Sequence, residues 1–69
     1  MLTQILVVWQ EKDVTHTAAT SSKAGGERIA KAVSDHIKGE CFCIIRECPN
    51  GENYNTKEFQ IWRSGLRMQ

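Results

Sequence analysis

The chain has 69 residues, with nine Lys and Arg against eight Asp and Glu and a net charge of +1 at pH 7. This length suffices for one small domain and excludes a multidomain enzyme, and the near balance of charges with 41% hydrophobic residues argues against intrinsic disorder. The longest apolar run, 5–9, is far too short to span a bilayer. We therefore expect one cytoplasmic domain over residues 1–69 with no membrane contact.

The N-terminal segment 2–10, LTQILVVWQ, is short and rich in β-branched and aromatic residues, which predicts a strand. Apolar side chains occupy both odd and even positions from Ile5 to Trp9, so both faces of this strand are apolar. Such a strand is typical of a sheet that is covered on both sides. After a charged turn at 11–13, residues 14–19 (VTHTAA) predict a weaker second strand at an edge of the sheet.

A helix after the hydroxyl-rich run 20–22 is the clearest element of the sequence, because those hydroxyls can cap its first turn. Gly39 is placed to end this helix in the left-handed conformation. Gly25 and Gly26 weaken the first turn, so the helix either begins near Gly26 or packs closely against something there. At 100° per residue, one apolar arc of about 160° contains Ile29, Ala30, Ala32, Val33, His36 and Ile37.

The C-terminal half reads as a hairpin. Residues 41–48 (CFCIIREC) predict a strand, and the following Pro-Asn-Gly at 49–51 predicts a turn. Residues 57–63 (KEFQIWR) alternate as a strand does, whereas residues 64–69 show no pattern. We expect this tail to fray.

Together these elements predict an α+β fold in which one amphipathic helix packs on one face of a mainly antiparallel sheet of three or four strands, in the order β(β)αββ. One helix covers one face only. The alternation in 57–63 separates Trp62 from Phe59 and Ile61, and we assign Trp62 to the uncovered face. With it we expect one apolar set from 2–10 and one set from 41–48, either Phe42 with Ile44 or Cys43 with Ile45. That face is too apolar to stay in water, so we expect a second copy or a target protein to cover it.

The sequence offers weak signals for chemistry. Cys41, Cys43 and Cys48 are odd in number, and their spacing suits neither a disulfide framework nor a zinc site, so we interpret them as reduced, packed thiols. His36 has no recognisable nucleophile or carboxylate pair beside it, and 20–27 (TSSKAGGE) lacks the order of a phosphate-binding loop. The sequence therefore predicts no enzyme, no metal and no cofactor.

A protein-binding role is the interpretation that the sequence favours most. Trp and Arg are enriched at the centres of protein interfaces. We hypothesise a non-enzymatic binding or regulatory module that acts through a sheet face or edge as a homodimer. The predicted contact residues are Trp9, Tyr54, Trp62 and Arg63, and Trp62→Ala is expected to weaken association.

Nucleic-acid binding is an alternative, because aromatic side chains beside cations can form a stacking platform for single strands. Phosphate contacts would then come from Arg46, Lys57, Arg63 and Arg67, and affinity would fall steeply with salt. The interleaving of acidic and basic residues leaves no continuous basic stripe, which argues against this alternative.

A strand, a charged loop, a threonine-rich segment, one helix and a hairpin follow one another in this chain. That layout resembles several small phage proteins that inhibit host machinery, including some anti-CRISPR proteins. The resemblance is one of layout alone and implies, as a further alternative, an inhibitor of host machinery.

Overall fold

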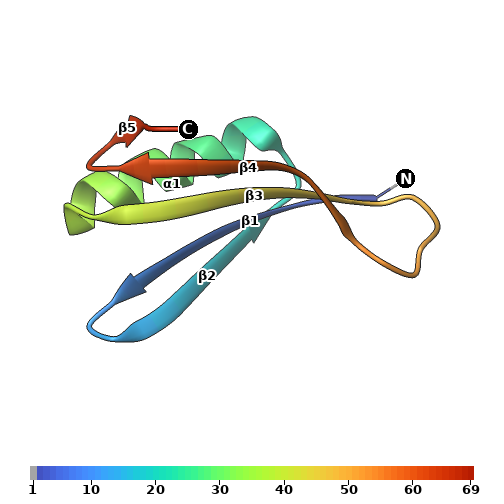
Figure 1. Ribbon diagram of the computed structural model, residues 1–69, viewed down its shortest axis with the longest axis horizontal. Coiled ribbons are helices and arrows are strands. Elements are labelled where there is room, and N and C mark those ends of the chain that lie inside the picture. Colours follow the sequence, from blue (N-terminus) through green and yellow to red (C-terminus); the bar gives the residue numbers. More distant parts are fainter. Residues whose placement is uncertain (1) are drawn as a thin grey trace.

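A computed structural model describes residues 2–69 (Figure 1). Its elements are β1 (Leu2–Glu11), β2 (Val14–Thr20), α1 (Lys23–Ile37), β3 (Glu40–Cys48), β4 (Asn55–Arg63) and β5 (Leu66–Arg67). The strands form one antiparallel sheet in the order β2-β1-β3-β4-β5, with α1 packed on one face. The predicted α+β fold is confirmed, although the sheet has five strands rather than three or four. Within residues 2–69, no helix combines the length and apolar character needed to cross a membrane.

The β1–β2 hairpin is closed by a two-residue turn. Lys12 and Asp13 both have left-handed backbone, with φ of 54° and 65°. This geometry matches the right-handed twist of paired strands better than an ordinary turn would. The turn confirms β2 as a strand, and the sheet order places it at an edge, as the sequence predicts.

Helix α1 begins after Ser22, whose hydroxyl oxygen accepts a hydrogen bond from the Gly25 backbone N–H at 2.9 Å. At the other end, the left-handed residue is Lys38, with φ of 53°, and not Gly39 as predicted. This conformation turns the N–H groups of Lys38 and Gly39 toward the carbonyl oxygen of Ser34.

The face of α1 that packs on the sheet is built from small residues. Gly26, Ala30 and Ser34 are buried and lie one turn apart, whereas Ala32 and His36, predicted inside the apolar arc, are exposed. A Cβ at position 26 would overlap the Cγ2 methyl of Ile5, so only glycine allows this approach. The helix therefore starts at Lys23 and tolerates its glycines because the sheet packs closely there.

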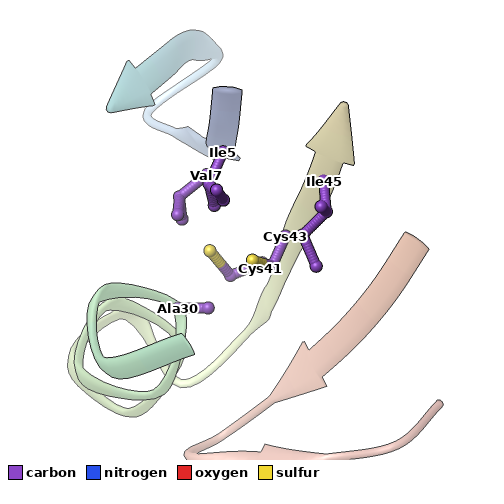
Figure 2. Close-up of a cluster of buried hydrophobic side chains, with 6 residues drawn as sticks. All are labelled: Ile5, Val7, Ala30, Cys41, Cys43 and Ile45. Atoms are coloured by element: carbon purple, nitrogen blue, oxygen red, sulfur yellow. The ribbon is translucent and has the colours of Figure 1, made fainter. Parts of the chain in front are cut away.

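Between α1 and the sheet lies the hydrophobic core (Figure 2), which consists of Ile5, Val7, Ala30, Cys41, Cys43 and Ile45. The three cysteines are free and buried, which confirms their interpretation as packed thiols. Burial raises the pKa of the Cys41 thiol to about 11 and raises that of Cys43. Both thiols therefore stay protonated and serve as small apolar groups.

The C-terminal tail 64–69, which we expected to fray, instead folds back as β5 on β4. The backbone N–H of Gly65 donates to the buried Ser34 hydroxyl at 3.0 Å, and that of Met68 donates to the Ile61 carbonyl at 2.7 Å. Ser34 is distant in sequence, whereas Ile61 lies across a two-residue turn at Ser64 and Gly65, whose φ values are 50° and 86°. This turn and these contacts order the tail although it has no pattern of apolar residues.

Candidate protein-binding surface

Both tryptophans lie on the helix side of the sheet. Trp9 and Trp62 are the register partners of Cys41 on its two sides, and both are partly buried against the core. Cross-strand partners point to the same face, and the Cys41 side chain is in the core. The assignment of Trp62 to the uncovered face is therefore wrong, and Phe59 occupies that face instead.

A buried amide explains this reversal. Gln60 is fully buried, and its Nε2 donates to Oε2 of Glu27 at 2.8 Å and to Oε2 of Glu58 at 2.7 Å. Its Oε1 accepts a hydrogen bond from Nε1 of Trp62 at 2.9 Å. Every polar group of the amide therefore has a hydrogen-bond partner. This is why Gln60, a polar residue usually found in solvent, can be buried on the helix side of the sheet.

Two cations complete this network at the surface. Lys23 Nζ lies 2.9 Å from Glu58 Oε1, and Arg67 Nη2 lies 3.1 Å from Glu58 Oε2. The hydrogen bond from Lys23 holds the pKa of Glu58 below its ordinary value. Arg67 also lies 3.7 Å from Glu27, so this predicted phosphate contact is engaged by two carboxylates.

The opposite side of the sheet, here called the open face, carries two rows of large apolar side chains that run across the central strands. One row pairs Leu6 with Ile44 and Ile44 with Phe59; the parallel row is Val8, Phe42 and Ile61. These six side chains are called the apolar patch. Five of them are partly exposed, and Phe59 is 49% exposed.

The patch is continuous and is not interrupted by polar groups. The Phe42 and Phe59 rings connect the two rows, with their centroids 5.5 Å apart. Toward the sheet edges, Ala19 is the partner of Leu6, and the backbone of Met68 is hydrogen-bonded to Ile61. A continuous, partly exposed apolar patch of this kind is typical of the centre of a protein interface.

Polar side chains border the patch at both ends of the strands. At one end, the Arg46 guanidinium lies 4.7 Å from the centroid of the Tyr54 ring. At the other end, the Arg63 guanidinium donates a hydrogen bond to Glu40, its register partner. Lys57 is exposed at the irregularity where β4 shifts its register against β3.

The predicted contact residues are therefore divided between two sides of the molecule. Tyr54 and Arg63 lie around the open face, as does Arg46, a predicted nucleic-acid contact. Trp9 and Trp62 lie on the helix side of the sheet, where Trp9 also stacks on His16 of β2. The six residues of the apolar patch were not predicted as one surface. Alternation divides the residues of each strand between two faces, but it does not show which face packs against the helix.

A hollow of about 660 Å³ lies at one end of the patch, between the tip of the β1–β2 hairpin and the end of α1. Val8 and Phe42 line it from the patch, and Trp9 and Ile37 line it from the helix side. Its carboxylates are Glu11 and Glu40, of which Glu40 is paired with Arg63. Among residues 2–69, no three His, Cys, Asp or Glu side chains are grouped as a metal site requires.

Comparisons with protein-family models, curated proteins and solved structures give no match for this chain. The likeness to phage inhibitors thus remains a resemblance of layout. The class that the fold and surface define is a small α+β domain with one helix-covered and one uncovered apolar sheet face.

Proposed function

We propose that this chain is a non-enzymatic protein-binding module that acts as a homodimer, with the open face of one copy packed on the open face of the other. The observation that supports the proposal is the apolar patch: six large apolar side chains in two cross-strand rows, partly exposed and bordered by polar residues. An apolar centre with a polar border is the usual anatomy of a protein interface.

A second copy suits this face for physical reasons. Twisted sheets pack face to face about 10 Å apart when apolar side chains from both can interdigitate. The patch itself is uncharged, and a net charge of +1 causes little repulsion between copies. The resulting dimer would bury both patches between two sheets and place a helix on each outer side.

The proposal extends to the location of the protein and to its possible targets. Buried, reduced thiols at all three cysteines fit a cytoplasmic protein. An inhibitor of host machinery would use the same open face against its target. The nucleic-acid alternative has less support, because the guanidinium groups of Arg63 and Arg67 are paired with carboxylates.

The test is to replace Phe59, the most exposed residue of the patch, by glutamine and to measure self-association by sedimentation equilibrium. We expect Phe59→Gln to raise the dimer dissociation constant about 30-fold, equivalent to about 2 kcal/mol, with an unchanged circular dichroism spectrum. Ala32→Gln places the same polar group on the exposed side of α1 and should leave association unchanged. A wild-type chain that stays monomeric at all concentrations would contradict the proposal.

A further inference from the structure

The outer edge of β2 is a long free edge of the sheet. In residues 2–69, β2 pairs with β1 alone, and it lies at the lower border of the sheet in Figure 1. On the opposite side, β5 pairs only with Trp62 and Arg63, so the rest of β4 is an edge as well, but that edge carries Lys57 and Glu58 and the register irregularity against β3. An edge strand presents a row of unpaired N–H and C=O groups, and its length sets how much pairing it can offer.

β2 has none of the features that usually protect an edge. Its seven residues, VTHTAAT, include no proline and no Asp, Glu, Lys or Arg. It pairs with β1 in continuous register from Val14 to Thr20, so no bulge twists it away. Thr15, Thr17 and Ala19 are exposed, and these small or β-branched side chains leave room for a neighbouring strand.

We infer that β2 is a second self-association surface, which pairs antiparallel with β2 of another copy about a two-fold axis at Thr17. Thr17 is the middle residue of the strand, so this register alone pairs all seven residues. Thr17 then faces Thr17, His16 faces Ala18, and no two like charges are opposed.

The register also fixes which way each copy faces. Partners in an antiparallel pair point to the same side of the sheet, and a shift by one residue would turn the second copy over. With Thr17 on the axis, two five-stranded sheets join into one of ten strands. Both helices then lie on one side and both apolar patches on the other.

A second copy is a better occupant of this edge than a strand from a charged partner. The strand has no Asp, Glu, Lys or Arg that could pair with a charged partner, and a two-fold axis at its middle residue lets the same edge serve both copies over its full length. The contact uses backbone groups of the edge and leaves the apolar patch free. It therefore does not depend on the dimer proposed through the open face.

Disulfide trapping tests the pairing. Thr17→Cys is made together with Phe59→Gln, so that contact through the open face is weakened, and the protein is exposed to a mild oxidant at low concentration. We expect a disulfide-linked dimer on a non-reducing gel, because the two introduced thiols face each other across the axis. The native cysteines are buried and should not contribute.

Thr15→Cys in the same background is the matched control, because Thr15 and Thr17 share one face of β2 and are both exposed. In the inferred register the two Thr15 positions are about 13 Å apart, beyond the reach of a disulfide. Cross-linking at position 17 at least ten times faster than at position 15 supports the inference. Equal rates at both positions, or no dimer at position 17, overturn it without affecting the proposal for the open face.

Discussion

At Gly26, a single hydrogen atom in place of a side chain sets the distance between α1 and the sheet. A Cβ added there would overlap the Cγ2 methyl of Ile5 and lie 3.2 Å from Sγ of Cys43. Both neighbours are buried in the core and cannot easily move. The glycine that weakens the isolated helix therefore strengthens the packed molecule.

Gly26→Ala should lower the free energy of unfolding by about 1–2 kcal/mol, because overpacking costs more than alanine gains in helix propensity. Urea denaturation followed by circular dichroism measures this change. Gly39→Ala is the control, since its Cβ would meet nothing closer than 3.6 Å, and it should leave stability nearly unchanged. Equal effects of the two substitutions would show that close packing at Gly26 is not the reason for its glycine.

Individual residues also show where prediction from the sequence fails. The pattern in 57–63 identifies β4 and its two alternating sets correctly. It cannot reveal that Gln60 is buried, because the partners that satisfy its amide include Glu27, which is far away in the chain. Ser34 is buried for a similar reason, since its hydroxyl accepts from the backbone of Gly65.

At the scale of elements, the ion pair between Lys23 and Glu58 joins the first turn of α1 to β4. The contact lowers the pKa of Glu58 from 4.5 and raises the pKa of Lys23 from 10.5. The contribution of Glu58 to stability is full above pH 4.5 and is lost as the pH falls through its lowered pKa in the folded state. The contribution of Lys23 to stability is full below pH 10.5 and is lost as the pH rises through the raised pKa of Lys23 in the folded state.

Glu58→Gln should therefore lower the urea midpoint at pH 7, and its difference from wild type should shrink at about pH 3, below the ordinary pKa of 4.5, because the carboxyl of the unfolded chain is then protonated. Asp35→Asn removes a carboxylate that is exposed on the helix surface and serves as the control, with a small effect at both pH values. A difference for Glu58→Gln that is the same at both pH values would contradict the assigned role of the pair.

Elements with a clear pattern of apolar residues were predictable, whereas the short element that lacks such a pattern was not. The turn after β3 has its own residue chemistry and was located from it, and the capping hydroxyls were placed in the run 20–22 that contains Ser22, although the first helical residue was left open. β5 follows a Ser64-Gly65 turn with positive φ at both residues, but its two residues are too few for a strand pattern, and contacts with Ile61 and Ser34 complete its order. The candidate surface was only partly predictable for the same reason: which face of β4 meets the helix is decided by tertiary contacts.

For the whole molecule, pairing of open faces links folding to association. A dimer that separates on unfolding has a thermal midpoint that rises with protein concentration. We expect this dependence for the wild-type chain and a weaker one for Phe59→Gln, measured by differential scanning fluorimetry over a wide concentration range. A wild-type midpoint that is independent of concentration would indicate that association does not accompany folding.

The amide of Gln60 also has a consequence for how the chain avoids incorrect folds. Strands that are apolar on both faces could slide along one another with little penalty, since any alignment buries similar groups. Sliding β4 by two residues would put either a carboxylate or an indole where the amide now donates to Glu27 of α1. Such a mispaired sheet would leave buried polar groups without partners, so one uncharged side chain penalises the competing alignments that the apolar residues cannot distinguish.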